Sequence, residues 1–212
     1  IMAILQVNHL AKTFSNSTIV LKDISFSVEK GECLTIIGSS GSGKSTLIKM
    51  ILGQDTNFQG ELKLGTSIKI GYISQNIIFE DNEKTVLDYF LEGNNLSETE
   101  ARSKLAKYGF RQENAFKRIG KLSGGEKVRI ILMKLIQKDI NFLILDEPTN
   151  HIDIDTREIL EEALKEYKGT VLFVSHDRFF INAIANRVLN IEDYKIKSYY
   201  GNYDDFTMKN II

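Results

Sequence analysis

Residues 38 to 45 read GSSGSGKS, a run of small residues that ends in a lysine and a serine. Glycines let the backbone curl so that several N–H groups point at one centre, and such a nest at the start of a helix binds phosphate oxygens. Lys44 can reach the outer phosphates of a nucleoside triphosphate, and the Ser45 hydroxyl can bind Mg²⁺. The residues expected to hold the phosphates are Gly38, Ser39, Ser40, Gly41, Ser42, Gly43, Lys44, Ser45 and Thr46.

Two carboxylates, Asp146 and Glu147, follow the apolar run at 142–145. A strand buried in a parallel sheet delivers its carboxyl end to the edge where ligands bind. Asp146 is then suited to Mg²⁺ or its water molecules, and Glu147 to polarising an attacking water. Solvated acids at a strand end are the alternative, but the glycine loop favours a site for phosphate hydrolysis.

A third motif, LSGGE, occupies residues 122–126 and opens an amphipathic segment. Ser123 is expected to cap a helix, and the two glycines after it leave bare N–H groups that can bind a second anion. An ordinary capped helix would explain the motif if the first phosphate site did not exist. The residues assigned to this motif are Ser123, Gly124, Gly125 and Glu126.

These motifs need strands and helices to position them, and the chain offers both in alternation. Buried strands at 33–38, 142–145 and 170–174, each followed by a helical pattern, predict a parallel sheet. Further strands are expected at 4–7, 19–21, 24–28, 188–191 and 195–198, with 61–64 and 69–73 as another pair. Helices are expected at 44–52, 85–109, 125–138 and 156–167, and from Asp177 onwards.

The pattern predicts one domain of 212 residues with two lobes. The core lobe takes about 1–75 and 139–212, and the smaller, helical lobe takes about 76–138. In the helix at 125–138 one apolar face is expected, with lysines on another face. The apolar positions are Val128, Ile131, Leu132, Leu135 and Ile136, and the lysines are Lys127, Lys134 and Lys138.

The composition is that of an ordinary water-exposed domain, with 42% hydrophobic residues, 26% charged residues and a formal net charge of −1. No apolar run approaches the roughly 20 residues that span a bilayer, so we expect no transmembrane segment. A single cysteine, Cys33, excludes an internal disulfide and fits a reducing cytoplasm.

The charges are unevenly distributed, because residues 102–138 contain eleven Lys or Arg against Glu113 and Glu126. Such a block is usually a solvated face, but it can also attract phosphate from a nucleotide or from RNA.

Taken together and in this order, the three motifs resemble those of the nucleotide-binding domain of ATP-binding-cassette (ABC) proteins. The glycine loop resembles Walker A, the strand with Asp146 and Glu147 resembles Walker B, and LSGGE resembles the ABC signature. The resemblance covers nearly the whole chain. It implies an α/β P-loop NTPase core with a parallel sheet flanked by helices, an N-terminal antiparallel β part and a helical subdomain, with ATP and Mg²⁺ as ligands.

The resemblance also assigns roles to four further residues. Gln75 in YISQ is similar to the Q-loop glutamine, which senses Mg²⁺ and couples the two lobes. Asp153 is similar to the D-loop aspartate, and His176 in VSHD to the switch histidine that contacts the γ-phosphate. Phe14 stands where an aromatic residue stacks on adenine. The implied catalytic residues are Glu147, His176 and Gln75, and the implied metal ligands are Ser45, Gln75 and Asp146.

At the level of subfamily the chain resembles the ABC-F group. The segments that carry this resemblance are EPTNHID at 147–153, SHDRFF at 175–180 and YGNYDDF at 200–206. Members of that group have no transmembrane domain, carry two nucleotide-binding domains in one chain and act on the ribosome, some of them protecting it from antibiotics. LSGGEKVR and the short path from Gln75 to Ser123 are similar to the second domain, so we expect the C-terminal half of a longer cytoplasmic protein.

Two other classes of protein stay open. The ATPase subunit of a membrane transporter would pair with a permease, but its D-loop usually reads closer to SALD than to the NHID of this chain. A binding module gated by ATP without hydrolysis is the third class, and Glu147 argues against it. In the family, two such domains close head to tail around two ATP molecules, so we expect each site to be completed by the signature of a second domain.

Overall fold

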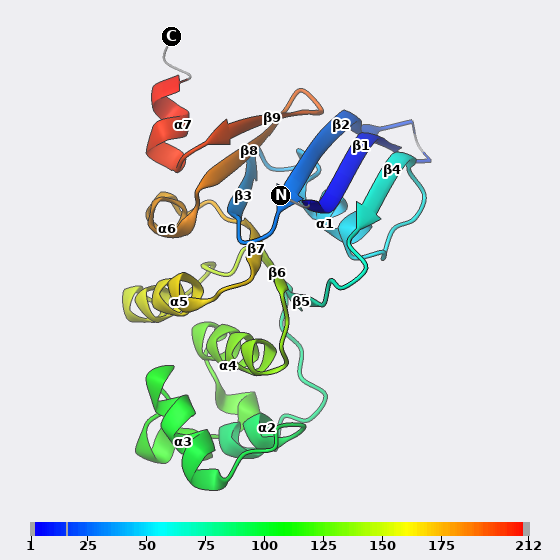
Figure 1. Ribbon diagram of the computed structural model, residues 1–212. Coiled ribbons are helices and arrows are strands. Elements are labelled where there is room, and N and C mark those ends of the chain that lie inside the picture. Colours follow the sequence, from blue (N-terminus) through cyan, green and yellow to red (C-terminus); the bar gives the residue numbers. More distant parts are fainter. Residues whose placement is uncertain (1–2, 16, 210–212) are drawn as a thin grey trace.

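The computed structural model describes residues 3–15 and 17–209, and its centre is a six-stranded sheet in the order β5-β6-β7-β3-β8-β9 (Figure 1). The first five strands run parallel and β9 is antiparallel to β8, which confirms the predicted parallel core. Every residue of β6 and β7 is buried, as expected for strands covered on both faces. The bounds are β3 Cys33–Gly38, β5 Ile70–Ile73, β6 Phe142–Asp146, β7 Thr170–Val174, β8 Arg187–Glu192 and β9 Lys195–Tyr200.

A second, antiparallel sheet is formed by β2 (Ile19–Glu29), β1 (Ala3–Thr13) and β4 (Gln59–Leu64), in that order. The prediction of two strands at 19–21 and 24–28 was wrong, because they are the two ends of the single strand β2. One of the two residues between them, Asp23, has a φ of 57°, and the register with β1 shifts between the pairs that flank it. This irregularity interrupts the alternation of apolar and polar side chains that marks a strand.

The predicted pairing of the strands at 61–64 and 69–73 was also wrong. β4 pairs with β1 in the antiparallel sheet, whereas β5 pairs with β6 at the edge of the parallel sheet. The loop between them crosses from one sheet to the other. It is held there by Asn141, whose side chain accepts a hydrogen bond from the Lys69 backbone N–H and donates one to the Ser67 carbonyl.

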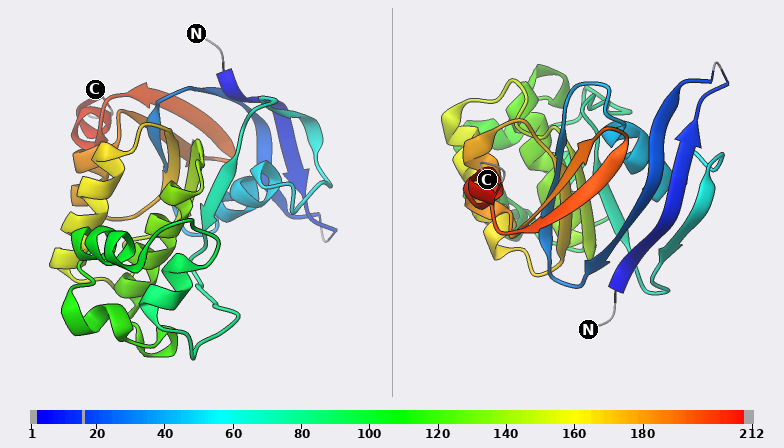
Figure 2. Two further views of the ribbon diagram at one scale, coloured as in Figure 1. Left: turned by 60° about the horizontal axis from the view of Figure 1, so that its bottom comes forward. Right: turned by 90° about the horizontal axis from the view of Figure 1, so that it is seen from above.

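Helices cover the two faces of the parallel sheet. Helix α1 (Lys44–Ile51) lies between the two sheets, and its apolar residues share one core cluster with β1, β2 and β3 (Figure 2). Helices α4 (Gly124–Gln137), α5 (Ile154–Glu166) and α6 (Arg178–Ile184) cover the opposite face. Helix α7 (Tyr203–Lys209), which the sequence did not predict, packs beside β9 through Phe206 and Tyr199.

The helical region expected at 85–109 is two helices, α2 (Val86–Leu91) and α3 (Glu98–Lys107). Gly93, with a φ of 77°, lies in the break between them. Helix α3 begins at a capping box, in which the side chains of Ser97 and Glu100 each accept from the other's backbone N–H. Two short 3₁₀ turns, Gln112–Phe116 and Ile119–Lys121, then lead to α4.

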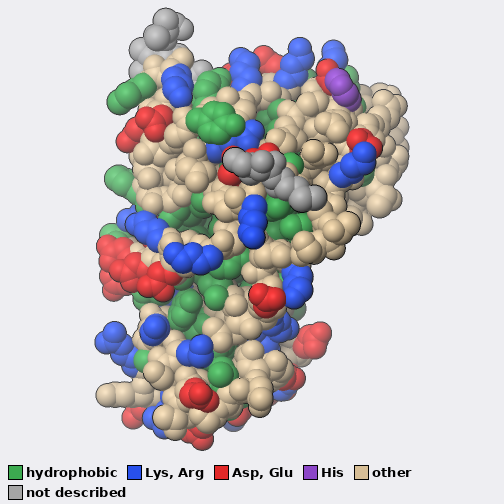
Figure 3. Space-filling model, viewed as in Figure 1, with side chains coloured by type: hydrophobic (Ala, Val, Ile, Leu, Met, Phe, Trp, Pro, Cys, Tyr) green, Lys and Arg blue, Asp and Glu red, His purple; other side chains and the backbone are tan. Residues whose placement is uncertain are grey.

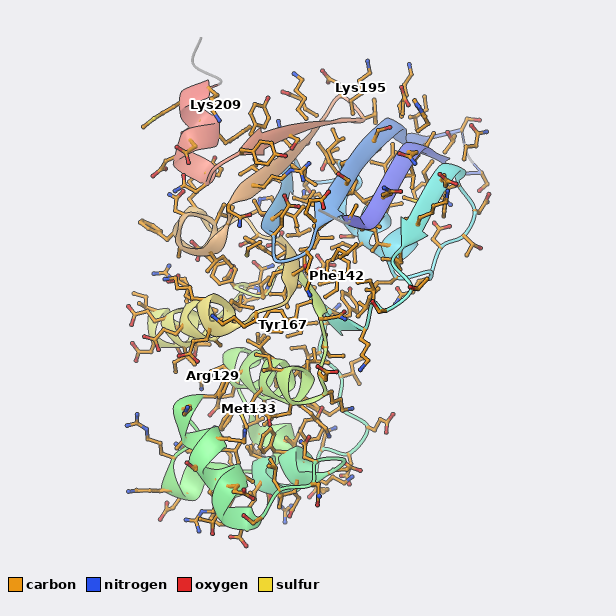
Figure 4. The ribbon with its side chains drawn as sticks, in the orientation of Figure 1. Arg129, Met133, Phe142, Tyr167, Lys195 and Lys209 are labelled. Atoms are coloured by element: carbon orange, nitrogen blue, oxygen red, sulfur yellow. The ribbon has the colours of Figure 1, made fainter. Side chains whose placement is uncertain are left out.

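Helix α4 is buried on two faces, where the sequence predicted one. Val128 and Leu132, two residues of the predicted apolar face, belong to the cluster against the sheet. Ile130 and Met133 belong to a separate cluster with α2 and α3 (Figure 4). Lys134, expected among solvated lysines, donates to the Tyr89 carbonyl at 2.8 Å and has its ammonium 3.8 Å from the centre of the Tyr89 ring.

The basic block at 102–138 is not a uniformly positive surface. The lower part of Figure 3, where the helical region lies, carries Lys and Arg side chains interspersed with Asp and Glu. Some of the acids come from outside the block, since Arg118 pairs with Glu83 and Lys134 lies 3.9 Å from Glu92. Across the described ranges, no helix has the length and apolar character needed to cross a membrane.

Candidate active site

The glycine loop connects β3 to α1, as its sequence requires. Gly43 is the residue that begins α1 and has a φ of 95°; a Cβ at this position would lie 2.9 Å from the Leu21 side chain. Only glycine fits both conditions. The first turn of α1 contains neither a capping side chain nor an acidic residue, so its N–H groups and the positive end of the helix dipole face the loop. This is the local structure that binds a phosphate.

Lys44 lies folded into the same loop. Its Nζ donates to the carbonyls of Gly38 and Ser39, both at 2.8 Å, and lies 3.5 Å from Ser42 Oγ. Burial lowers the pKa of Lys44, while the carboxylates of Glu147 and Asp146 act in the opposite direction. The ammonium is thus held by weak neutral acceptors beside two acids, where an anionic ligand can displace those acceptors.

Asp146 is the last residue of β6 and is buried, with 8% of its surface exposed. Burial raises the pKa of its carboxyl, and Lys44 and Lys49 counteract that shift through their charge. A hydrogen bond between Tyr72 of β5 and Asp146 also lowers the carboxyl pKa. A carboxylate in such a setting is stabilised further by any cation that reaches it.

Glu147 and His176 leave neighbouring strands at the same edge of the sheet. The Glu147 backbone N–H donates to the Val174 carbonyl at 2.9 Å, and Glu147 itself has a φ of 52°. Its Oε1 lies 3.3 Å from Nε2 of His176, while Oε2 is buried and has no hydrogen-bond partner among the residues that the structure describes. Burial raises the pKa of Glu147, although the charge of His176 acts to lower it.

A cleft of about 480 Å³ brings most of the predicted site residues together. The loop residues from Ser40 to Thr46 line it, together with the carboxyl ends of β6 and β7. Phe14 also lines the cleft, with 45% of its surface exposed and a ring centre 5.7 Å from Lys12 Nζ. The remaining predicted residues in its lining are Gln75, Asp146, Glu147 and His176.

The other predicted residues lie outside this cleft. Gly38 and Ser39 line a neighbouring hollow of about 410 Å³ formed with the turn between β8 and β9. The residues from Ser123 to Glu126 form the start of α4, and Asp153 begins α5, where its Oδ1 accepts from the Thr156 N–H at 2.7 Å. The hydrogen bonds from Thr156 lower the pKa of Asp153.

The start of α4 differs from the bare anion site that the sequence suggested. Ser123 and Glu126 form a capping box, so the N–H of Glu126 is bonded to Ser123 Oγ at 3.3 Å. The Glu126 carboxylate accepts from the Ser123 N–H at 2.7 Å and from Lys117 at 2.9 Å. Although burial acts to raise it, these bonds leave the pKa of Glu126 lowered. The N–H groups of Gly124 and Gly125 therefore lie at a helix start that already holds the negative charge of the Glu126 carboxylate.

Sequence reasoning missed three features of the site. Tyr72 contacts Asp146, and Asn150 lines the cleft. Ser175, which is buried, has its Oγ 2.9 Å from Thr149 Oγ1 and accepts from the Asp177 N–H at 3.0 Å. All of these residues lie within three positions of a motif residue, so the signal available was their place at or just after the carboxyl ends of β5, β6 and β7.

The residues present fit a magnesium ion. Ser45, Gln75 and Asp146 line one cleft and offer a hydroxyl, an amide and a carboxylate oxygen, the hard ligands that Mg²⁺ prefers. The partnerless Oε2 of Glu147 is a buried acceptor aimed at no described residue, which suits a water molecule next to such an ion.

Three comparisons with known proteins extend these observations. A family model described as ABC transporter matches residues 21–150. The chain is 39% identical over 211 residues to the energy-dependent translational throttle protein EttA of Escherichia coli (strain K12), covering 96% of this chain and 38% of that protein. It is 38% identical over 212 residues to ABC transporter F family member 2 of Arabidopsis thaliana, covering 99% of this chain and 31% of that protein.

Among solved structures, an ABC transporter in an inward-facing conformation superposes with a TM-score of 0.77 at 25% identity. The superposition covers 94% of this chain and 84% of that one. The chain spans about a third of the length of the curated relatives that it matches.

Proposed function

Because this chain belongs to the ATP-binding-cassette family and is a domain of the ABC-F type, we propose that it binds and hydrolyses ATP as part of a protein that acts on the ribosome. The observation that carries the hydrolysis is the single cleft in which the glycine loop meets Glu147 and His176. A phosphate-binding nest beside a buried carboxylate of raised pKa is the arrangement that transfers a phosphoryl group to water.

Binding begins with the triphosphate at the start of α1. The backbone N–H groups of the loop bind the phosphate oxygens, and Lys44 exchanges its bonds to the Gly38 and Ser39 carbonyls for bonds to the outer phosphates. This exchange replaces two neutral acceptors with charged ones, so it favours the bound state. Phe14, exposed on the lining of the same cleft, stacks on the adenine ring.

Ser45, Gln75 and Asp146 would hold the magnesium ion. The ion supplies neutralisation of the charge that gathers on the phosphate oxygens. The Asp146 carboxylate has a raised pKa because it is buried, so a cation nearby favours its ionised form.

Hydrolysis needs a base for the attacking water, and Glu147 is placed for this role. Its Oε1 faces His176, and its buried Oε2 has no hydrogen-bond partner among the described residues, so a small rotation of the carboxylate would let it accept a proton from a water molecule in the cleft. Burial raises the pKa of the carboxyl and therefore makes it a stronger base than a solvated glutamate. His176, with 61% of its side chain exposed, contacts the outermost phosphate.

The site of one chain is a half site. The signature residues from Ser123 to Glu126 and Asp153 lie outside the cleft that holds the glycine loop. We propose that a second nucleotide-binding domain, from the same longer chain or from a second copy, presents these residues to the nucleotide head to tail. The two domains then close only when ATP is bound, and hydrolysis lets them open again. The pair thus alternates between a closed and an open state.

The ribosome is the proposed partner because the curated relatives include a protein named for throttling translation. Under this proposal the protein works in the cytoplasm and binds ribosomal RNA when its two domains are closed on ATP. A transporter ATPase paired with a membrane permease is the second candidate. The NHID sequence at 150–153 and the ABC-F relatives argue against it.

The test is sedimentation of the full-length parent protein with ribosomes. The variant E147Q with ATP should co-sediment, whereas K44A, which lacks the ammonium that binds the phosphates, should remain in the supernatant. Equal sedimentation of the two variants would contradict the proposal that ATP-driven closure controls docking. Co-purification with a permease, and no ribosome binding in either case, would favour the transporter.

A further inference from the structure

Arg157 of α5 contacts the turn that carries His176. Its Nη1 lies 3.4 Å from Oδ2 of Asp177, the residue after His176, and its Nε lies 3.5 Å from Glu161. The guanidinium also lies 5.5 Å from the centre of the Phe179 ring. Only 24% of the Arg157 side chain is exposed, so these contacts are partly shielded from water.

Asp177 fixes the backbone of that turn. Its Oδ1 accepts from the N–H groups of Phe179 at 3.0 Å and Phe180 at 3.2 Å, which begins α6. Its own N–H donates to Ser175 Oγ at 3.0 Å. His176 is therefore held between two anchored neighbours, and the direction of its imidazole towards Glu147 depends on where Asp177 lies.

The first turn of α5 is anchored at its other side to α4. Oγ1 of Thr156 accepts from Nη1 of Arg129 at 3.2 Å. A Cβ on Gly125 would lie 2.6 Å from the Thr156 side chain, so the two helices touch at the start of α4. Thr156 and Arg157 are consecutive residues. One short piece of helix thus contacts both the start of α4 and the His176 turn.

We propose that Arg157 is a positioning residue for His176. Through Arg157, a movement of the α4 start or of Asp153 changes where the His176 imidazole lies. The proposal rests on the role given to His176 at the outermost phosphate. A guanidinium suits this task because its planar fork pairs with a carboxylate while its face stacks on an aromatic ring. A lysine at the same position could keep the charge but not the stacking, so R157K should restore the function only in part.

The direct test is the NMR spectrum of the histidine imidazoles in the full chain. The chain has three histidines, so three Cε1–Hε1 signals are expected and can be assigned with H9Q, H151Q and H176Q. R157Q should shift the His176 signal and leave those of His9 and His151 in place. D177N should also shift the His176 signal, although its amide oxygen can still cap α6. The double variant R157Q/D177N should shift that signal no further than either single variant does.

The matched control is K165Q. Lys165 lies on the same helix and also pairs with Glu161, at 3.9 Å, but the structure records no contact between it and Asp177 within the described residues. K165Q should leave all three signals unchanged. An unmoved His176 signal in R157Q, or shifts of R157Q and D177N that add in the double variant, would overturn the proposal. If R157Q does not fold, the His176 signals of R157K, D177N and their double variant are compared in the same way.

Turnover gives the second readout. R157Q should lower the rate of ATP hydrolysis about tenfold, with the affinity for a fluorescent ATP analogue unchanged within about twofold, and R157K should lie between it and the parent. A loss of affinity equal to the loss of turnover would argue for a purely structural role and against the proposal. If the full-length protein, in which two nucleotide-binding domains can pair, shows no hydrolysis, the proposed ATPase activity fails, while the imidazole spectrum still decides the role of Arg157.

Discussion

The Glu147 carboxylate lies 3.3 Å from the imidazole of His176, because β6 and β7 are neighbours in the sheet and end at the same edge. The pair is fixed by the backbone, since the Glu147 N–H donates to the last residue of β7. One oxygen of the carboxylate thereby faces His176, and the other is buried without a hydrogen-bond partner among the described residues. This relationship determines which changes should separate binding from hydrolysis.

Replacement of Glu147 by glutamine should stop hydrolysis and retain ATP. Glutamine keeps the volume and the contact to His176 but cannot accept a proton, so turnover should fall about 10²- to 10⁴-fold. Phosphate release measures turnover, and size-exclusion chromatography with ATP should show more dimer than in the parent. E158Q, which changes an exposed glutamate on α5, is the control and should behave like the parent. Hydrolysis by E147Q at the parent rate would remove Glu147 from the mechanism.

The same variant should be more stable than the parent at neutral pH. The folded protein raises the pKa of Glu147 above its ordinary 4.5, so the folded state binds this proton more tightly than the unfolded state. Its contribution to stability is thus fully present below pH 4.5 and is lost as the pH rises through the raised pKa. E147Q avoids this loss, and its Tm should exceed that of the parent at pH 8 by roughly 2–4 °C for each kcal/mol gained.

The Tm difference should shrink as the pH is lowered towards 4.5. Differential scanning calorimetry across this range checks the trend, with E158Q as the reference. A gain in Tm that does not depend on pH would mean that shape rather than charge is responsible.

Replacement of Lys44 by alanine should weaken nucleotide binding. The ammonium exchanges neutral acceptors for charged phosphates, and hydrogen bonds between charged groups contribute about 1.5–3 kcal/mol, so the Kd should rise about 10- to 100-fold. Titration of a fluorescent ATP analogue measures the Kd. K49A removes an exposed lysine from the same helix and should change it little. An unchanged Kd in K44A would contradict the assignment.

A site shared between two domains should make hydrolysis depend on protein concentration. Turnover per chain should rise as the concentration increases, because under this proposal an unpaired chain holds only a half site. A mixture of K44A, which keeps its signature, with G124R, which keeps its glycine loop, should recover part of the activity that each lacks alone. Gly124 is suited to this test because, among the described residues outside its own helix turn, a Cβ there would meet no atom within 4 Å. Turnover independent of concentration, with no recovery in the mixture, would show that one chain suffices.

The two glycines at the start of α4 should differ in their tolerance of alanine. A Cβ on Gly125 would lie 2.6 Å from Thr156, so G125A should lower the free energy of unfolding by about 1–3 kcal/mol. G124A meets open space and should be neutral or stabilise the helix by up to about 1 kcal/mol. Urea unfolding measures both. Equal effects would mean that the packing of α4 on α5 does not restrict the helix start.

The motifs proposed to bind phosphate were predictable from sequence because their local structure depends on neighbouring residues. The loop at Gly43 and the cap at Ser123 depend on a few consecutive residues, and the structure has them at the expected helix starts. The carboxyl ends of β6 and β7 follow from apolar runs. Which strands lie side by side is decided by contacts far apart in sequence, so the pairing of β4 with β1 could not be inferred from its own residues.

The errors have similar physical causes. The bulge near Asp23 hid the continuity of β2, and the cluster around Phe90 gave α4 a second apolar face that its helical periodicity alone did not reveal. The Glu126 carboxylate at the start of α4 is held by Lys117, a residue from the preceding turn. The roles given to Phe14 and Gln75 stay predictions, although both line the cleft.

The two buried faces of α4 have a consequence for how the protein unfolds. Val128 and Leu132 pack on the sheet, while Ile130 and Met133 complete the apolar cluster of α2 and α3. If either the sheet or the α2–α3 cluster unfolded, one side of α4 would be exposed to water. The packing of α4 on the remaining partner would then be weakened. The helical region and the sheet therefore constitute one cooperative unit, and the amide protons in the middle of α4 should be among the last to exchange with solvent.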